Sequence, residues 1–250
     1  MDAMSIFKKF ILSCLLFPLA LTAMADAQLA NFKQTIEASL KKINPNYQIA
    51  QVEPSHIQGF YNVQLQDGPL LYVSADAKHF FAGELYYLDG QKMVSITDQD
   101  ATRARIALMD ELNPAEMIIF SPKLPVKTKA HITVFTDVDC FYCQKLHKEV
   151  PELNARGIEV RYMAFPRAGV NSASAQKLIT AWCSKNPQDA MTRLKNLENL
   201  APITCPNPVA KDYDLGKRMG VNGTPAIIAP DGSLIPGYRP AAELAKLLGV

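Results

Sequence analysis

The chain has 250 residues, of which 26 are Lys or Arg and 24 are Asp or Glu, so its formal net charge is +2. Hydrophobic residues make up 48% of it, which is the share of an ordinary globular protein and excludes an intrinsically disordered chain. Charges of both signs are interspersed, so neither nucleic acid nor a membrane surface is expected as a partner.

Residues 1–25 have the pattern of a secretory signal. Two lysines precede an apolar run over residues 10–23, and a small-residue cleavage site ends at Ala25. The run is too short to span a bilayer comfortably. We therefore predict export, with Cys14 lost with the signal. A lipid anchor at Cys14 is disfavoured because the apolar run continues well past it.

Residues 26–97 predict a small α+β domain in which a helix precedes an antiparallel sheet. Apolar residues at helical spacing indicate an amphipathic helix over 28–42. Strand-like runs come next at 47–52, 57–65, 70–74, 80–88 and 92–96. Because about 70 residues can bury only a modest core, a partner that covers an edge of this sheet would help it.

Residues 98–116 predict a linker that contains a helix over 98–112. Asp98 is a candidate cap for this helix, and Asn113-Pro114 would end it. Two interpretations stay open: the helix is a spacer or hinge between two domains, or it packs on one of its neighbours.

Residues 117–250 predict an α/β domain. Strands are expected over 117–120, 131–136, 158–164, 226–229 and 233–235, and helices over 140–153, 171–184, 187–200, 209–219 and 241–248. Strands that alternate with helices favour a central sheet with helices on its faces.

Cys140 and Cys143 form a C-x-x-C motif between a predicted strand and the helix after it. The unpaired N–H groups and the macrodipole at a helix N-terminus stabilise a thiolate, which makes Cys140 the expected nucleophile. Cys143 is expected to be the more buried, less reactive thiol that resolves the reaction. A C-x-x-C at such a junction indicates a thiol–disulfide redox site.

A zinc half-site is an alternative, because His147 comes after Cys143 at a spacing that a metal could use. A structural zinc needs four ligands, usually from a second pair, and the sequence has no second C-x-x-C. We therefore predict neither a metal nor another cofactor, and a packing or surface role for His147.

Removal of the signal leaves four cysteines, for which three pairings exist. The redox interpretation pairs Cys140 with Cys143 and leaves Cys183 with Cys205. The second pair closes a loop of about twenty residues and should contribute about 3 kcal/mol in the chain-entropy model, so we expect it to be structural.

Four stretches in the second half carry a resemblance to a known family. They are 134–137, Cys140-x-Tyr142-Cys143-x-Lys145-Leu146-His147, Gly220-Val221-x-Gly223-Thr224-Pro225-Ala226 and Pro236-Gly237-Tyr238. On these residues the chain resembles the DsbC/DsbG family of bacterial periplasmic thiol:disulfide isomerases, whose second disulfide falls at Cys183 and Cys205. The resemblance implies a thioredoxin-like α/β fold with a helical insertion, preceded by a cystatin-like α+β dimerisation domain and a linker helix.

The resemblance also implies a periplasmic homodimer whose N-terminal domains pair by their sheet edges. Its clients would be misfolded, disulfide-containing exported proteins, and a membrane thiol reductase of the DsbD type would keep its thiols reduced. Pro225 would be cis, although X–Pro bonds are usually trans. Thr224 and Pro225 would bind the client beside the C-x-x-C, together with Phe141 and Tyr142.

Three residues depart from the patterns of this family and its relatives. Phe141 stands where the family more often has Gly, and adds an apolar surface that either favours unfolded clients or packs locally. Asp139 brings a carboxylate that opposes formation of the Cys140 thiolate if it lies close. Val134 occupies the place of a buried Asp in thioredoxin, so water or another group must handle the proton of Cys143.

We therefore predict a protein disulfide isomerase or reductase that acts through a reduced Cys140–Cys143 pair and mixed disulfides. A dithiol oxidase of the DsbA type shares the motif but needs no dimerisation module. A chaperone or holdase that uses the cleft of a dimer is the alternative from another class.

Overall fold

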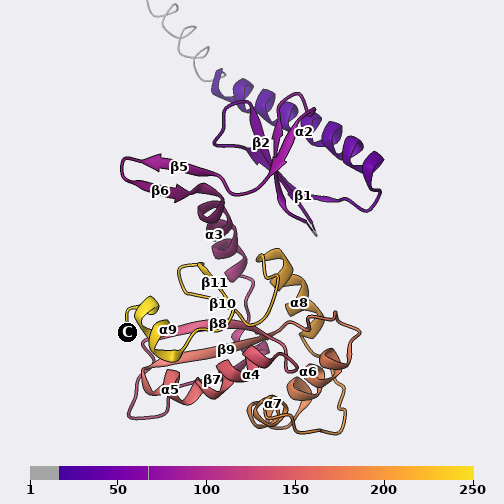
Figure 1. Cartoon of the computed structure of the whole chain (residues 1–250). Helices are drawn as coiled ribbons and strands as arrows, with labels where there is room; N and C mark the ends of the chain where they lie inside the picture. The colour runs from indigo at the N-terminus through magenta and orange to yellow at the C-terminus, as the bar shows by residue number, and fades with distance from the viewer. Residues whose placement is uncertain (1–16, 67) are drawn as a thin grey trace, which may run out of the picture. The chain divides into compact units, whose positions relative to one another are not determined.

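The computed structural model describes residues 17–66 and 68–250. Most of the predicted export signal, Cys14 included, lies outside these residues. The chain divides into two compact units, Met1–Glu84 and Leu85–Val250, and each is described by itself (Figure 1). The division precedes the predicted one at residue 97, because the backbone of Leu85 is bonded to the start of the next helix. Its N–H donates to Thr97 Oγ1 at 2.8 Å, and its carbonyl accepts from the Ile96 N–H at 2.8 Å.

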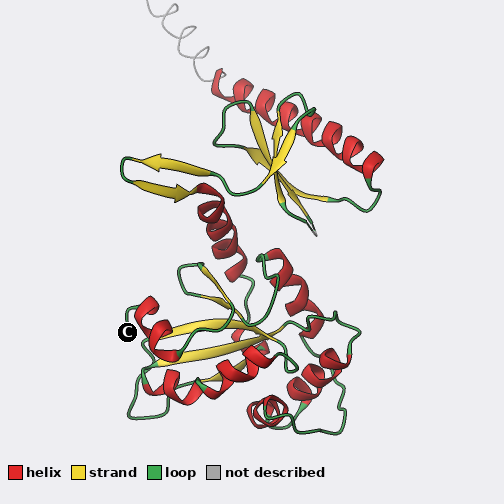
Figure 2. Ribbon diagram, in the orientation of Figure 1, coloured by secondary structure: helices red, strands yellow, loops and turns green. Residues whose placement is uncertain are grey.

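The first unit is a helix packed on a four-stranded antiparallel sheet (Figure 2). Its elements are α2 (Phe17–Ile43), β1 (Ile49–Pro54), β2 (Phe60–Leu65), β3 (Leu70–Ser74) and β4 (Phe80–Ala82), with the strands in the order β1-β2-β3-β4. Phe32, Ile36 and Leu40 recur every fourth residue of α2 and bury one helix face against Val63 and Val73 of the sheet. The α+β domain predicted from the sequence is thereby confirmed.

The prediction of one strand over 80–88 is wrong. Phe80–Ala82 pairs with β3, whereas β5 (Tyr86–Asp89) pairs with β6 (Lys92–Ser95) in a separate two-stranded sheet. The two halves have different partners, so the run breaks at Gly83-Glu84. Gly90 takes the positive φ of 58° that the tight turn between β5 and β6 requires.

Helix α3 (Ile96–Met109) belongs to the second unit and packs against it. Its N-cap is Ser95, whose hydroxyl accepts from the Asp98 N–H at 3.1 Å, so the expected cap at Asp98 is wrong. Leu108 and Met109 pack against the hydrophobic cluster on one face of the sheet of this unit. Of the two interpretations of this helix, packing on a neighbour is therefore the one observed.

The second unit is built on a five-stranded sheet. Its strands are β7 (Ile118–Phe120), β8 (Ala130–Thr136), β9 (Ile158–Ala164), β10 (Ala226–Ile228) and β11 (Leu234–Pro236), in the order β11-β10-β8-β9-β7. The central pair β8–β9 is parallel and the other pairs are antiparallel. A 3₁₀ turn, Pro114–Glu116, precedes β7.

Helices cover both faces of this sheet, as the predicted α/β layout requires (Figure 1). They are α4 (Phe141–Lys148), α5 (Val150–Ala155), α6 (Ala173–Cys183), α7 (Pro187–Lys195), α8 (Val209–Arg218) and α9 (Ala241–Leu248). Ile132 and Val134 point into the cluster with α4, α5, α6, α7 and α9. Phe135, on the opposite face, packs in the cluster with α3 and α8.

The helix predicted over 140–153 is in fact two helices. Pro151 has no N–H to donate and its ring would clash with the carbonyl four residues back, so α4 ends at Lys148 and α5 starts at Val150 with Pro151 in its first turn. The C-x-x-C motif therefore lies at the start of a short helix, α4, and not of one long helix.

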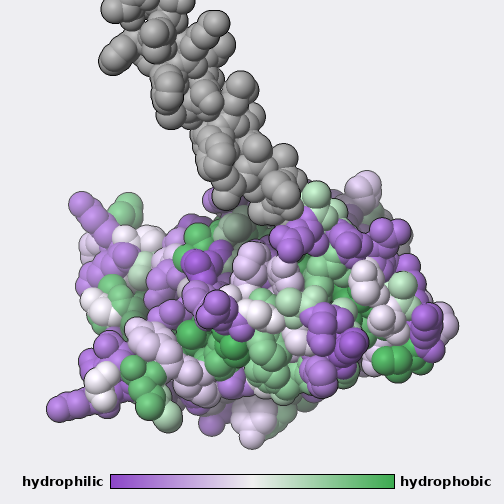
Figure 3. Space-filling model, turned by 90° about the horizontal axis from the view of Figure 1, so that it is seen from above, coloured by the Kyte–Doolittle hydropathy of each residue, from purple (hydrophilic) through white to green (hydrophobic). Residues whose placement is uncertain are grey.

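The surface in Figure 3 interleaves hydrophilic and hydrophobic side chains, with the hydrophobic ones in several small groups. Over the residues that the structure describes, no helix combines the length and the hydropathy needed to cross a bilayer.

Candidate active site

The C-x-x-C motif lies where β8 ends and α4 begins, with Cys140 as the N-cap of α4. The buried Asp137 carboxylate holds the connecting loop. Its two oxygens accept from the N–H groups of Asp139 and Arg167, each at 2.9 Å. The Asp137 carbonyl accepts from the Cys140 N–H at 3.2 Å. Hydrogen bonds therefore fix the loop that presents the first thiol.

Cys140 is arranged to ionise. It caps α4 without a side-chain capping bond, so a thiolate there gains from the helix N–H groups and macrodipole. Its pKa falls to about 5, chiefly because the Cys143 thiol hydrogen-bonds to it, with the charge of Arg167 also acting in this direction and burial opposing. A protonated Cys140 donates to the Thr224 carbonyl at 3.1 Å, a bond that ionisation gives up. The thiolate is nevertheless the favoured form at neutral pH.

Cys143 has the opposite character. It is 1% exposed, and its pKa is raised because burial disfavours the thiolate and because it donates to Cys140. The charge of Lys195 and the backbone N–H of Asp137 work against this rise. The site therefore holds one ionised and one protonated thiol side by side.

Thr224 and Pro225 meet the thiols at the start of β10. The Thr224–Pro225 peptide bond is cis. The Thr224 carbonyl oxygen lies 3.1 Å from Cys140 Sγ. The Pro225 carbonyl accepts from the Gly237 N–H at 2.8 Å, which ties the loop to the end of β11. Gly223 has open space where a side chain would be. The structure thus brings together Cys140 and Thr224, which are 84 residues apart in the sequence.

Phe141 and Tyr142, between the two cysteines, project from the surface. They are 69% and 55% exposed, and their rings contact edge to face with centroids 5.4 Å apart. Local packing therefore leaves most of the Phe141 ring accessible, and the pair forms an apolar surface next to a reactive sulfur.

The Asp139 carboxylate next to Cys140 is paired. Lys177 Nζ lies 2.7 Å from Asp139 Oδ1, and Arg167 Nη2 donates to the Asp139 carbonyl at 3.3 Å. The Lys177 ammonium therefore offsets the carboxylate that was expected to oppose the Cys140 thiolate.

His147 takes a buried packing position in α4. Its Nδ1 lies 3.0 Å from Tyr162 Oη and its Nε2 lies 3.0 Å from Thr192 Oγ1. Burial, with the charge of Lys195, lowers its pKa to about 4, so it is neutral at physiological pH. Within residues 17–66 and 68–250, no group of three or more His, Cys, Asp or Glu side chains is arranged to hold a metal ion.

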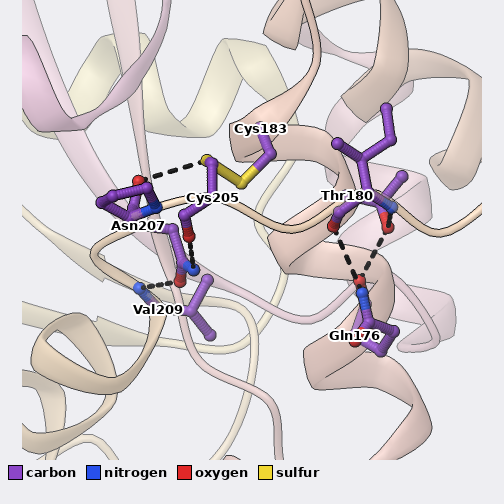
Figure 4. Close-up of a disulfide and its surroundings, with 8 residues drawn as sticks. Gln176, Thr180, Cys183, Cys205, Asn207 and Val209 are labelled. Atoms are coloured by element: carbon purple, nitrogen blue, oxygen red, sulfur yellow. Dashed lines mark hydrogen bonds between the residues drawn. A yellow bond between two sulfur atoms is a disulfide. The ribbon is translucent and has the colours of Figure 1, made fainter.

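A disulfide joins Cys183 at the end of α6 to Cys205 in the loop before α8, with an S–S distance of 2.01 Å (Figure 4). Asn207 Nδ2 donates to the Cys205 carbonyl at 2.8 Å, and Asn207 Oδ1 accepts from the Val209 N–H at 3.2 Å. The indole of Trp182, next to Cys183, donates to the Glu116 carbonyl at 2.7 Å. The disulfide therefore anchors a loop outside the redox site.

Three residues of the site were not singled out from the sequence: Asp137, Arg167 and Lys195. Nothing in the sequence distinguishes Asp137 and Arg167 from other charged loop residues. Only the fold brings them together beside Cys140. Lys195 could have been recognised from the sequence, because it lies four residues after Met191 and so falls on the apolar face of α7. A charged residue on that face signals a buried cation.

Two family models match the chain. One describes the N-terminal domain of disulfide bond isomerase proteins and covers residues 22–98. The other describes a thioredoxin-like domain and covers residues 123–249. The two models match the chain in the same order as the two units of the structure.

Relatives match the chain over most of their length. The chain is 37% identical over 241 residues to the thiol:disulfide interchange protein DsbC of Dickeya dadantii, covering 96% of this chain and 95% of the relative. It is 34% identical to DsbC of Escherichia coli, covering 89% and 91%. Among solved structures, a disulfide interchange protein from Neisseria gonorrhoeae matches with a TM-score of 0.49 and 27% identity, over 55% of this chain and 96% of that one.

Proposed function

The chain belongs to the DsbC family of thiol:disulfide interchange proteins and is a disulfide isomerase of this type, and we propose that Cys140 is its nucleophile and Cys143 its resolving thiol. The observation that carries the assignment is the asymmetry of the pair. Cys140 has a pKa of about 5 at the N-cap of α4, whereas burial keeps Cys143 protonated. Family membership also favours the isomerase over the dithiol oxidase.

The reaction begins when the Cys140 thiolate attacks a wrong disulfide in a misfolded client. The Cys140–client disulfide forms, the client disulfide breaks, and one client sulfur leaves as a thiolate. That thiolate then attacks a different bridge or the mixed disulfide, which releases Cys140 and completes isomerisation. Alternatively, Cys143 attacks Cys140, and the client leaves reduced.

The client binds along the cis Thr224–Pro225 segment in this proposal. An extended client strand hydrogen-bonds to the Thr224 backbone, as in strand addition, while Pro225 has no N–H that would compete. Phe141 and Tyr142 contact apolar client side chains beside the nucleophile, because their rings are more than half exposed. Such contacts favour unfolded chains, which expose apolar residues.

We infer a homodimer formed through the N-terminal domain. β4 is an edge strand of its sheet, and it exposes Phe80 and Phe81 by 55% and 41%. An apolar edge strand invites pairing with another chain, and a second copy supplies an identical edge. The cleft of such a dimer would also serve a chaperone function.

We place the protein in the periplasm, exported by the signal predicted at residues 1–25. The Cys183–Cys205 disulfide supports an oxidising compartment. There an isomerase needs an electron source to keep Cys140 and Cys143 reduced, and a membrane thiol reductase of the DsbD type is the partner we propose.

Two cysteine variants test the catalytic assignment. Cys140→Ala should abolish the recovery of activity from a ribonuclease with scrambled disulfides. Cys143→Ala should keep part of this recovery and accumulate mixed disulfides, seen by mass spectrometry, because attack by Cys140 does not need it. Retention of full activity by Cys140→Ala would refute the assignment.

The redox state in the periplasm tests the direction of the reaction. Rapid acid quenching and thiol alkylation should find Cys140 and Cys143 mostly reduced, because only a thiolate can attack an existing disulfide. A mostly oxidised pair would contradict isomerisation and indicate a donor of disulfides.

A further inference from the structure

A lysine is buried at the base of the redox site. Lys195 is the last residue of α7 and is 2% exposed. Its Nζ donates to Thr136 Oγ1 at 2.6 Å and to the Asp137 carbonyl at 3.0 Å. Thr136 is the last residue of β8, and Asp137 begins the loop from β8 to Cys140. The amino group is therefore fixed by the same segment that positions the thiols.

Few of the surrounding groups can balance this charge. Asp137 is paired with Arg167 and Asp139 with Lys177. His147 is neutral at physiological pH. Tyr162, whose ring centroid lies 5.8 Å from Lys195 Nζ, has a raised pKa because of its burial and stays neutral as well. Four groups act on Lys195 electrostatically: Cys143 most strongly, then Asp137, Cys140 and Asp139. Because both aspartates already pair with another cation, the two cysteines are left.

A buried ammonium is costly, because the ion gives up its hydration by water. Its two hydrogen-bond acceptors here are neutral, so they offset only part of this cost. A thiolate in the same low-dielectric interior would be strongly attracted to it. Both thiols are buried, with exposed fractions of 3% for Cys140 and 1% for Cys143, but Cys140 is the N-cap of α4 and gains from the helix N-terminus. Cys143 is therefore the group that most needs a buried cation.

We propose that Lys195 is a positioning residue whose ammonium group stabilises the Cys143 thiolate during resolution of the mixed disulfide. This inference rests on the proposed function, in which Cys143 is the resolving thiol.

The resolution step balances without another reactant. Cys143 loses its proton to solvent, and its thiolate attacks Cys140 Sγ of the mixed disulfide. The Cys140–Cys143 disulfide forms, the bond from Cys140 to the client breaks, and the client thiolate takes up a proton. Burial lowers the pKa of Lys195, whereas the charge of Cys143 raises it, so formation of the Cys143 thiolate favours the ammonium form of Lys195. Lys195 neither gives nor takes a proton in this step and acts only on the stability of the Cys143 thiolate.

The test separates the two thiol reactions in time. Reduced full-length protein is mixed with a chromogenic aromatic disulfide, whose first thiol is released by Cys140 and whose second is released when Cys143 resolves. Lys195→Met, of similar length without charge, should slow the second release about tenfold at neutral pH and raise its pH midpoint by about one unit, since a pKa unit is a tenfold change in thiolate. The first release should change less than about twofold.

Three further variants control for structure. Lys195→Gln keeps a hydrogen-bond donor without charge and should resemble Lys195→Met, whereas Lys195→Arg should recover most of the second rate. Lys148→Met, on the exposed side of α4, should behave as wild type. Melting temperatures show which variants are folded. A folded Lys195→Gln or Lys195→Met with an unchanged second-phase midpoint would overturn the inference, whereas absence of the first release in wild type would refute the proposed function instead.

Discussion

Asp212 is a buried carboxyl group whose ionisation should govern the pH dependence of stability. It is 3% exposed on α8, and its Oδ2 accepts from the Ala164 N–H at 3.0 Å. Burial raises its pKa to about 7, with the Ala164 bond acting in the opposite direction. Between about pH 4 and pH 7 the folded chain holds a proton that the unfolded chain has released. The free energy of unfolding therefore falls as the pH rises through this window.

Asp212→Asn should remove this dependence, because an amide keeps the acceptor for Ala164 and never ionises. Relative to wild type, the variant should gain about 1–3 kcal/mol between pH 5 and pH 8. Denaturant unfolding followed by fluorescence of Trp182, the one tryptophan of the chain, measures it. Asp214→Asn, exposed on the same helix, is the matched control. A constant difference between Asp212→Asn and wild type at both pH values would disprove the prediction.

At the scale of single residues, the sequence identifies chemistry but not burial. Cys140 and Cys143 stand out because two thiols at a strand-to-helix junction have a known chemical use. Asp212 does not, since charged residues in amphipathic helices are usually solvated and only packing shows that this one is not. Lys195 is indicated only by its place on the apolar face of α7. Likewise, the Asp139 charge is visible in the sequence, whereas its pairing with Lys177 comes from a helix 38 residues away.

At the scale of elements, Arg105 is the residue that docks α3. It is 5% exposed, and its Nε donates to the Gly232 carbonyl at 2.7 Å, in the turn before β11. Its Nη2 also donates to Thr102 Oγ1 at 2.9 Å. Truncation would leave the buried carbonyl unsatisfied and open a cavity, so Arg105→Ala should lower the free energy of unfolding by about 2–3 kcal/mol.

The matched control lies two residues earlier on the same helix. Arg103 has a side chain that is 69% exposed and pairs with Asp100, so Arg103→Ala should change stability by less than about 1 kcal/mol. Denaturant unfolding monitored at Trp182 reports on the second unit, to which both residues belong. Equal effects of the two variants would show that α3 is not docked through Arg105.

Element boundaries were predictable where local chemistry decides them. Strand β9 spans the predicted residues, 158–164, because a run rich in β-branched and aromatic residues is bounded on both sides. The predicted strand over 80–88 fails because strand pairing depends on partners distant in sequence. The helix over 140–153 is different: Pro151 was visible in the sequence, and its helix-breaking effect should have divided the segment.

At the scale of the whole molecule, the reaction needs a client to stay bound while disulfides exchange. Cys140 can attack any accessible disulfide, but isomerisation requires that the released client thiolate attack again before the client dissociates. An exposed apolar surface around the site lengthens this contact. A second copy, joined through the N-terminal domain, would supply another such surface. Pairing at the β4 edge should therefore matter for catalysis on protein clients, but not for reaction with small disulfides.

Phe80→Glu should separate these two activities. A charge on the β4 edge opposes strand pairing, and Phe80 is 55% exposed, so folding should be retained. Analytical ultracentrifugation should find a monomer for the variant and a dimer for wild type. Recovery of scrambled ribonuclease should fall at least about fivefold, a loss of about 1 kcal/mol in catalytic efficiency, while Cys140 reacts with a small aromatic disulfide at the wild-type rate.

The matched control is Tyr47→Glu, which places a charge on an exposed aromatic residue before β1, at the other edge of the sheet. It should change neither the dimer nor the recovery of ribonuclease. A monomer with full activity on ribonuclease would show that dimerisation is dispensable, and a dimer would show that β4 is not the interface.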